Sequence, residues 1–402
     1  MIERKNYLDR IKPFIDKDII KVLTGIRRCG KSVMLKLIKE ELIKNGRSKE
    51  QFITLNFENL KNKPYCTVQA LNDYILERAK PNQKNYIFLD EIQEVEEWEK
   101  CINSLRADEE YDFDIYITGS NAKLLSGELA TYLAGRYVEF MIYPFSFQEF
   151  IESLKLSQEN ITTQEAFKKY IKYGGMPFLN NLNYSLEASM QYLKDLYSSI
   201  ILKDITQRNS IRDTDLLERI ISYILMNVGN TFSATSISKF FKSENRKASP
   251  ETILNYIRAC EEVMLIYKVQ RDDLIGKKIL NINEKYYIAD HGIRQAIFES
   301  NERDINQIFE NIIFLELLRK GYSVKVGKLN DLEIDFIATK NEERVYIQVA
   351  YLLASPETIE REFGVLEKIQ DNFPKYVISM DMFDISRNGI KHFNIIDFLL
   401  DK

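Results

Sequence analysis

Residues 24–32, which read Thr-Gly-Ile-Arg-Arg-Cys-Gly-Lys-Ser, constrain the fold more than any other part of the sequence. They contain the pattern G-x-x-x-x-G-K-S, whose four fixed positions are Gly25, Gly30, Lys31 and Ser32. The two glycines let the backbone turn tightly, so that successive amide N–H groups face the oxygens of a polyphosphate. In this pattern the lysine reaches the β- and γ-phosphates and the serine hydroxyl ligates Mg²⁺. The segment therefore predicts a phosphate-binding loop.

The residues on either side of the loop have the patterns of a strand and a helix, which the motif requires. Residues 19–24 are mostly apolar and β-rich, as in a central parallel strand. After the loop, apolar residues recur at helical spacing until Gly46 supplies a helix stop. The loop is therefore expected at a helix N-terminus, where unsatisfied N–H groups and the helix dipole favour an anion.

The loop residues themselves are the predicted contacts of ATP. Nine consecutive positions are expected to bind it: Gly25, Ile26, Arg27, Arg28, Cys29, Gly30, Lys31, Ser32 and Val33. Arg27 and Arg28 are unusual occupants, which add positive charge to the site, contact a neighbouring domain or form a solvated pair. Cys29 precedes a helix N-terminus, where thiol pKa values tend to fall. We therefore expect Cys29 to be alkylated readily without nucleotide and protected by ATP.

An acidic pair downstream completes the predicted hydrolytic site. The apolar run at residues 86–89 ends in Asp90 and Glu91. Strand ends commonly turn into acidic loops, but this order after a phosphate loop is typical of a Walker B element. Asp90 is expected to hold Mg²⁺ together with Ser32, and Glu91 to orient or polarise the attacking water. The sequence thus predicts Mg²⁺-dependent hydrolysis of ATP.

Three further strands are predicted at residues 52–57, 114–118 and 138–142. After the second of these, Asn121 is placed to sense the γ-phosphate or the water, with Ser120 or Thr118 as alternatives. The other interpretation is that Asn121 caps a helix. Arg136 is a candidate arginine finger, which acts within the chain or on a second copy in a homo-oligomer; the alternative is a local ion pair.

These motifs together resemble a known family. They are the loop at 24–32, Phe-Leu-Asp-Glu-Ile-Gln at 88–93, Ile-Thr-Gly-Ser-Asn at 117–121, Leu-Ala-Gly-Arg-Tyr at 133–137 and Tyr-Pro-Phe-Ser-Phe-Gln-Glu-Phe at 143–150. The combination resembles prokaryotic AAA-type P-loop ATPases whose chains end in a domain of unknown function with a restriction-endonuclease-like fold. The resemblance runs from Arg4 to about residue 350. It implies an ATPase that binds and hydrolyses ATP.

The 402 residues suggest several domains of α/β class. We expect a P-loop ATPase domain with a parallel sheet at 1–155, a helical region at 156–227, a winged-helix-like domain at 228–295 and a restriction-endonuclease-like domain at 300–402. Long helices are expected at 186–207 and 214–229. The N-terminus lacks a secretory signal pattern, no apolar run is long enough to span a bilayer, and the four cysteines show no disulfide framework. We therefore expect a cytoplasmic protein with no membrane partner.

The predicted winged helix consists of a helix at 233–242, a helix that begins at Pro250, and two strands near 265–270 and 285–289. Residues 228–290 carry ten Lys and Arg against eight Asp and Glu, a net charge of only +2. The whole chain has a net charge of −4, which argues against a globally basic nucleic-acid binder. A winged helix reads DNA in many proteins, whereas protein docking or a lid over the nucleotide fits this modest charge at least as well.

The last hundred residues have the order of a restriction-endonuclease core: a helix with Glu310, a strand with Asp335, then a second strand. Such nucleases need an acid-x-lysine triplet on the last strand to bind Mg²⁺ and activate water. Here the triplet is Gln348-Val349-Ala350, in which alanine cannot replace the lysine. We therefore expect a nuclease-like fold without nuclease activity.

ATP hydrolysis is expected to drive a conformational or assembly change in a protein or DNA partner. A switch or defence-type signalling protein, a DNA-remodelling motor and an ATP-gated DNA-binding protein or nuclease are the competing roles, and a nucleotide-binding scaffold without turnover is a further one. The partner surfaces are expected on the winged-helix and C-terminal domains.

Overall fold

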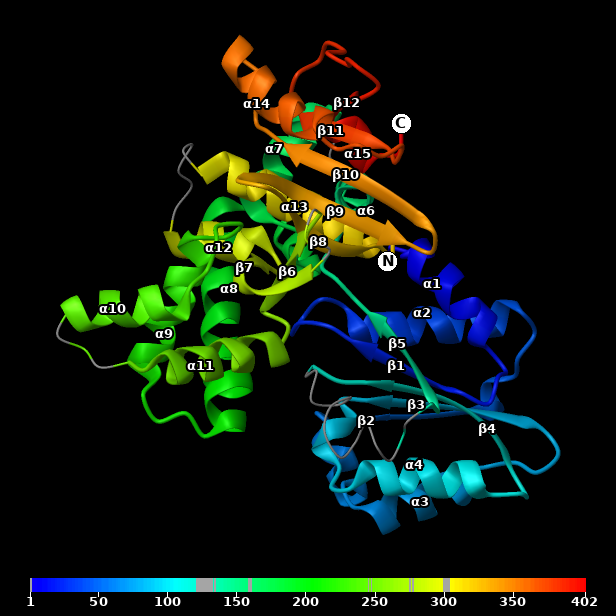
Figure 1. Ribbon diagram of the computed structural model, residues 1–402. Helices are drawn as coiled ribbons and strands as arrows, with labels where there is room; N and C mark the ends of the chain where they lie inside the picture. Colours follow the sequence, from blue (N-terminus) through cyan, green and yellow to red (C-terminus); the bar gives the residue numbers. More distant parts are fainter. Residues whose placement is uncertain are drawn as a thin grey trace. The chain divides into compact units, whose positions relative to one another are not determined.

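The computed structural model describes residues 2–120, 133, 135–157, 161–244, 246, 248–274, 276, 278–298 and 304–402, with no side-chain description at 278–283 (Figure 1). The chain divides into two compact units. Unit 1 is Met1–Tyr143 with the short segment Glu262–Met264, and unit 2 is Pro144–Glu261 with Leu265–Lys402. Among the described residues, no helix has both the length and the apolar character needed to cross a lipid bilayer.

Unit 1 is built on a five-stranded sheet in the order β2-β3-β4-β1-β5, in which every neighbouring pair is parallel. The strands are β1 Ile20–Thr24, β2 Phe52–Asn56, β3 Lys84–Asp90, β4 Asp112–Thr118 and β5 Tyr137–Met141. Each begins or ends within about two residues of the expected bounds. The predicted α/β fold with a parallel sheet is confirmed.

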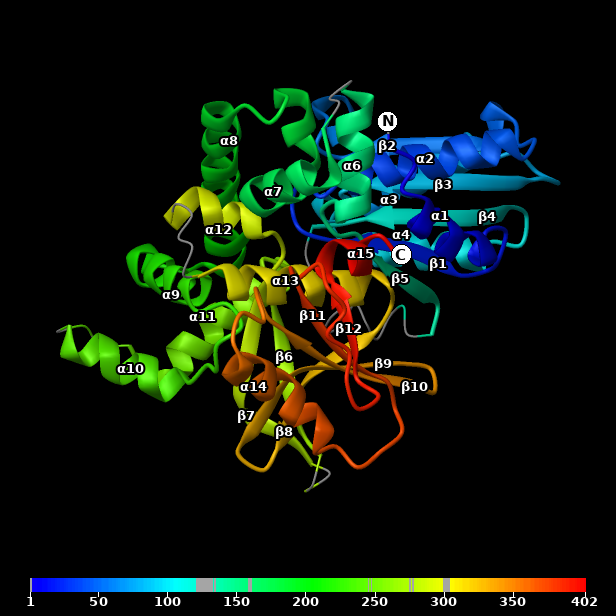
Figure 2. The same cartoon turned by 90° about the horizontal axis from the view of Figure 1, so that it is seen from above.

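Helices cover both faces of this sheet. They are α1 Lys5–Ile11, η1 Lys12–Phe14, α2 Lys31–Lys44, η2 Lys49–Gln51, η3 Leu60–Tyr65, α3 Val68–Leu76, η4 Ile92–Glu94 and α4 Trp98–Ala107. Because side chains alternate along a strand, Ile87 and Leu89 of β3 face one side, where they pack against α3 and α4. Helix α2 lies on the opposite face (Figures 1 and 2). The result is a three-layer arrangement with the sheet in the middle.

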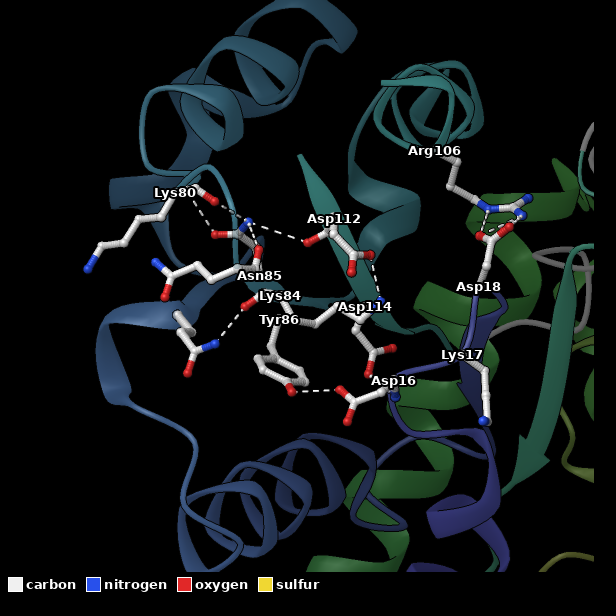
Figure 3. Close-up of polar contacts among 12 residues, drawn as sticks. Asp16, Lys17, Asp18, Lys80, Lys84, Asn85, Tyr86, Arg106, Asp112 and Asp114 are labelled. Carbon is white, nitrogen blue, oxygen red and sulfur yellow. Dashed lines mark hydrogen bonds and ion pairs between the residues drawn. The ribbon is translucent and has the colours of Figure 1, made fainter. Parts of the chain in front are cut away.

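At the amino-terminal ends of the strands, polar side chains form a connected network (Figure 3). The Tyr86 hydroxyl donates to Asp16 at 2.6 Å, and the Asp16 backbone N–H donates to Asp114 at 2.9 Å. Asp114 of β4 also forms a fully buried ion pair with Lys21 of β1. The pair joins two neighbouring strands inside the core and fixes the position of one against the other.

Unit 2 begins with a helical part. Its helices are α6 Phe147–Leu156, α7 Thr163–Tyr173, η6 Pro177–Leu182, α8 Leu186–Ser199, η7 Ile200–Gln207, α9 Thr214–Met226, α10 Ala234–Ser243, α11 Pro250–Glu262, α12 His291–Phe298 and α13 Ile305–Arg319. The expected helix at 186–207 is continuous in α8 and η7, but its last eight residues form a π-helix. Helices α9, α10 and α11 lie side by side in both views (Figures 1 and 2).

A seven-stranded mixed sheet follows, in the order β12-β11-β10-β9-β8-β6-β7. Its strands are β6 Ile266–Asp273, β7 Lys278–Ile288, β8 Ser323–Leu329, β9 Leu332–Lys340, β10 Glu343–Val349, β11 Lys375–Ser379 and β12 Lys391–Asn394, with helices α14 Pro356–Glu367 and α15 Ile395–Leu399. Ile337 packs with α14 residues, whereas its neighbour Phe336 packs on Phe314 of α13. The two helices therefore cover opposite faces.

The β6–β7 hairpin, expected as the wing of a separate domain, belongs to this sheet. Strand β6 pairs with β7 in antiparallel and, through Arg271–Asp273, with β8 in parallel. Strand β8 was not anticipated, because the sequence pattern pointed only to the two strands after it. Residues 228–295 and 300–402 thus contribute to one continuous sheet.

Candidate functional site

The predicted phosphate loop lies between β1 and α2, at the carboxyl edge of the sheet in unit 1. Gly25 and Gly30 have φ angles of 148° and 107°, a region that other residues avoid. A Cβ atom on Gly25 would approach the Ile142 carbonyl oxygen to 2.2 Å. The first glycine is therefore required by its backbone angle and by the close approach of the chain after β5.

The Lys31 ammonium is folded back onto the loop. Its Nζ atom donates to the carbonyl oxygens of Gly25 at 3.0 Å and Ile26 at 3.3 Å. It lies 3.9 Å from Oε1 of Glu91, and the side chain is only 4 % exposed. The positive charge thus lies inside the loop, where phosphate oxygens are expected to replace the two carbonyls as its partners.

Asp90, the last residue of β3, is held from both neighbouring strands. Thr118 at the end of β4 donates its hydroxyl to Oδ1 at 2.6 Å, and Asn56 at the end of β2 donates its amide to Oδ2 at 2.7 Å. Ser32 also forms a hydrogen bond with this carboxylate. Burial raises the pKa of Asp90, and the Thr118 and Ser32 hydroxyls oppose that shift. The structure brings the hydroxyl of Ser32 and the carboxylate of Asp90 together.

Glu91 follows in a left-handed conformation, with a φ angle of 56°. This turn sends its backbone N–H to the Thr118 hydroxyl oxygen at 2.9 Å. Ser120 donates to both carboxylate oxygens, at 2.9 and 3.0 Å, and Gln93 donates its amide to one of them. The Glu91 carboxylate is therefore positioned next to Lys31 by neutral donors.

The oxygen donors at this edge fit a nucleotide-bound Mg²⁺. Among the described residues, no group of three or more His, Cys, Asp or Glu side chains is arranged to hold a metal ion by itself. Mg²⁺ in nucleotide sites needs no such cage, because it takes one or two protein oxygens and completes its shell with phosphates and water. Ser32 and Asp90 offer that donor set.

The lowered pKa expected for the Cys29 thiol is wrong. Its side chain is fully buried, and burial raises the pKa of the thiol, although Lys31 and Arg4 lie near enough to oppose the shift. The helix N-terminus cannot lower the pKa of a thiol that points away from water into the core. We therefore expect slow alkylation of Cys29 whether or not nucleotide is bound.

The remaining loop residues differ in exposure. Ile26 is buried, Val33 is half-buried and Arg28 is exposed with a φ angle of 68°. Arg27 is half-buried and lies 3.8 Å from the carboxylate of Glu58, just after β2.

Among the described residues, Arg136 is a predicted catalytic residue that is not part of this cluster. Asn121 lies outside the described residues. Arg136 precedes β5 at the amino-terminal edge of the sheet, where its carbonyl accepts from Ile20 and its guanidinium donates to Asn103 at 3.3 Å. The loop lies at the other end of the strand, about 13 Å away at the rise of a parallel strand. Within one chain, Arg136 does not contact the phosphate loop.

A second polar cluster lies in unit 2, where the nuclease-like pattern was found. Gln348 accepts from the Asp335 backbone N–H at 2.7 Å, and the Val349 N–H donates to the Asp335 carboxylate at 2.9 Å. Lys285 of β7 enters this cluster, with Nζ 2.7 Å from Glu333 and 3.7 Å from Glu310. Burial raises the pKa of Asp335 well above its usual range, with Glu310 adding to the effect.

Several residues of the ATPase site were not predicted. Asn56 and Gln93 contact the two acids, and Arg4, a buried residue near the N-terminus, donates to the carbonyl of Cys29 at 3.0 Å. Asn56 ends a predicted strand and is paired in register with Asp90, so the strand order alone would have identified it. No sequence signal pointed to Arg4.

Comparisons with known proteins agree with this geometry. The family described as AAA domain matches residues 17–151, and a domain of unknown function matches residues 164–304. The second match ends before α13, so the last hundred residues lie outside it. The fold is similar to that of a Walker-type ATPase of Pyrococcus abyssi, with a TM-score of 0.51, 14% identity, and coverage of 74% of this chain and 95% of that one.

Two relatives match nearly the whole chain. An uncharacterized protein of Haemophilus influenzae is 39% identical over 402 residues, which is 100% of this chain and 99% of the relative. An uncharacterized protein of Methanocaldococcus jannaschii is 30% identical over 391 residues, 94% of this chain and 85% of the relative. The chain therefore belongs to the family of these two proteins, and its residues 17–151 match the AAA domain.

Proposed function

We propose that this protein is a Mg²⁺-dependent ATPase that couples hydrolysis to a conformational or assembly change in a protein or DNA partner. The observation that carries the proposal is the convergence of Lys31, Ser32, Asp90 and Glu91 at the carboxyl edge of one parallel sheet. A passive nucleotide scaffold would not need a carboxylate beyond the metal-binding one.

The roles of these residues follow from their chemistry. Lys31 and the loop amides bind the β- and γ-phosphate oxygens, while Ser32 and Asp90 offer oxygens to Mg²⁺. The bound ion would neutralise charge that develops on the phosphate oxygens. Glu91 accepts a hydrogen bond from a water molecule and aims it at the γ-phosphorus, in line with the bond to ADP.

The test is ATP turnover and nucleotide binding by the full chain with Mg²⁺. Lys31→Ala removes the ammonium that is folded onto the loop carbonyls and should abolish ATP binding. Glu91→Gln keeps the size and the donors around the side chain but removes the charge, so it should bind ATP normally and turn it over at least about 100-fold more slowly. Wild-type turnover by the Glu91 variant would remove Glu91 from this role, and failure of the unaltered chain to hydrolyse ATP would contradict the proposed function.

We further propose that Arg136 serves as an arginine finger from a second copy in a homo-oligomer. Its exposed position at the edge opposite to the loop supports action between copies rather than within one. An oligomer of this kind requires that the amino-terminal edge of one copy reach the nucleotide of the next.

A winged-helix partner domain is part of the proposal. The order α9, α10, α11, β6, β7 and the isolated bridge between Thr231 and Lys285 support such a fold. The charge of these residues is close to balanced, so a protein partner is favoured over DNA. Stimulation of ATP turnover by duplex DNA would reverse that preference.

We propose that the C-terminal nuclease-like domain does not cut DNA. Gln348 and Ala350 stand where an acid and a lysine are needed, and the Lys285 ammonium already neutralises Glu310 and Glu333. Supercoiled DNA incubated with the protein, ATP and Mg²⁺ or Mn²⁺ should remain intact. Cleavage that is lost in Asp335→Asn would establish the alternative, an ATP-gated nuclease.

A cytoplasmic location is proposed on the state of the cysteines. All four lie in the described part of the chain, and all four thiols are free. Free thiols are typical of reducing compartments.

A further inference from the structure

Arg4 lies near the start of the chain and contacts the phosphate loop. Its side chain is almost completely buried, at 2 % exposure. Its guanidinium donates through Nη1 to the Cys29 carbonyl at 3.0 Å and through Nη2 to the Tyr143 carbonyl at 2.7 Å. The guanidinium carbon also lies 4.6 Å from the centre of the Tyr7 ring. One buried cation thus joins the loop to the backbone after β5.

The position of the Cys29 carbonyl determines where the next amide points. In a trans peptide the C=O and N–H groups of one unit point in opposite directions. The carbonyl of Cys29 and the N–H of Gly30 belong to one such unit. Because Arg4 holds the carbonyl at the back of the loop, the Gly30 N–H is directed to the front, where the motif binds phosphate oxygens. A cation on the carbonyl also polarises this peptide and strengthens its N–H as a donor.

The second anchor of Arg4 is itself fixed. The Tyr143 N–H donates to the Tyr7 hydroxyl at 3.1 Å, and the Ile142 N–H donates to the Thr24 carbonyl at 2.8 Å. These bonds tie the residues after β5 to helix α1 and to the end of β1. Arg4 therefore connects the loop to a rigid support rather than to a free segment.

We infer that Arg4 is a positioning residue for nucleotide binding, which acts through the Cys29–Gly30 peptide and does not touch the nucleotide. The inference rests on the proposed ATP-binding function of the loop. It assigns a role to the N-terminal segment, which lies outside the residues 17–151 that match the AAA domain.

The experiment compares the Kd of a fluorescent ATP analogue among full-length variants at a temperature where circular dichroism shows each of them folded. Arg4→Ala should raise the Kd about 10- to 100-fold, the range for charge-assisted hydrogen bonds. The KM for ATP should rise by the same factor, while kcat at saturating ATP should change less than about threefold, because the catalytic acids keep their donors. Arg4→Lys keeps the charge but lacks the fork that spans two carbonyls, so its Kd should lie between those of the other two chains.

The matched control is Ile11→Ala in helix α1, which directly follows Arg4; Ile11 is 1 % exposed. This variant should lower the Tm and leave the Kd unchanged, which separates positioning from stability. Hydrogen exchange of residues 26–33 without nucleotide gives a second readout: it should accelerate in Arg4→Ala and not in Ile11→Ala. If Arg4→Ala binds the analogue as tightly as the unaltered chain, the inference is wrong while the proposed function stands. If the unaltered chain binds no nucleotide, both fall.

Discussion

At the scale of single residues, the ATPase site depends on one threonine hydroxyl that serves both acids. Thr118 donates to Asp90 and accepts from the backbone N–H of Glu91. The one hydroxyl proton is donated to Asp90, so in this arrangement Thr118 has no proton left to donate to a γ-phosphate oxygen, the role that the sequence offered as an alternative. Its role is to hold the Asp90 carboxylate and the Glu91 backbone in their relative positions.

Replacement of this hydroxyl should affect catalysis more than binding. Thr118→Val keeps the shape but removes both hydrogen bonds, and ATP turnover should fall about 10- to 100-fold, as for other residues that orient metal ligands. The Mg²⁺ concentration for half-maximal turnover should rise, and Thr118→Ser should restore both quantities. A valine variant with unchanged Mg²⁺ dependence would show that Asn56 and Ser32 suffice to hold Asp90.

Two neighbouring buried residues in unit 2 should respond to pH in opposite directions. Burial lowers the pKa of His291 from its ordinary value of 6.5 to about 4, with Arg319 and Arg294 adding to the effect. Burial raises the pKa of Asp290 from 3.8 to about 7, against the backbone N–H bonds it accepts. The stability from neutral His291 is therefore present above pH 6.5 and lost as pH falls through 4. The contribution of protonated Asp290 is present below pH 3.8 and lost as pH rises through 7.

His291→Gln should remove only one of these opposing effects. Glutamine can still donate to the Tyr170 carbonyl, which lies 2.7 Å from Nε2 of His291, but it binds no proton. Relative to the unaltered chain, the variant should gain stability on acidification from pH 6.5 to 4, on the order of 3 kcal/mol. Urea unfolding at several pH values measures this difference. Parallel stability curves for the two chains would show that His291 does not titrate in this way.

At the scale of elements, helix α7 is followed by two glycines, Gly174 and Gly175, against which the chain at Phe145 and at Asp290 packs closely. Gly175 donates its N–H to the Asp290 carboxylate at 2.6 Å, and a Cβ atom there would lie 2.2 Å from the Phe145 carbonyl oxygen. Gly292 has the same property, since its Cβ would meet the Tyr173 carbonyl oxygen at 2.0 Å. Glycine is thus required at these positions because two backbone segments approach each other closely.

Two alanine substitutions in unit 2 should therefore have opposite effects. Gly175→Ala forces backbone apart and should lower the free energy of unfolding by about 3 kcal/mol or more. Gly364→Ala lies inside helix α14, where a Cβ would meet only the flexible end of Glu360, and should raise it by about 0.5–1 kcal/mol. Calorimetry of both variants gives the comparison. Equal changes in the free energy of unfolding would mean that the backbone near Phe145 can shift to accommodate the added Cβ atom at little cost.

The elements could be predicted where one local pattern determines them. The strands of unit 1, the loop and α2 follow from apolar runs and glycine spacing, and the Asp90-Glu91 pair follows from its place after a strand. The contacts of Asn56 and Arg4 could not be predicted, because they depend on strand order and on a chain segment far away in sequence. The burial of Cys29 could not be predicted for the same reason, since the pattern gives its position before a helix but not what covers it.

At the scale of the whole molecule, the position of Arg136 leads to a test of assembly. Arg136→Ala should hydrolyse ATP slowly, and Lys31→Ala should not bind it. A mixture of the two variants should regain turnover, because the first supplies an intact nucleotide site and the second supplies Arg136. Arg106→Ala is the matched control, since Arg106 binds Asp18 at 2.8 Å and belongs to the same end of the sheet (Figure 3). That variant should keep full turnover alone. Slow turnover that no mixture rescues would contradict action between copies.

The continuity of the seven-stranded sheet in unit 2 has a consequence for any shortened form of the protein. A chain that stopped at residue 299 would keep the β6–β7 hairpin but lose β8, the partner of Arg271–Asp273. The unpaired N–H and C=O groups of β6 would then form an open edge, which is a template for pairing with other chains. Such a fragment should form aggregates on purification, whereas the full chain keeps this edge covered by its own later strand.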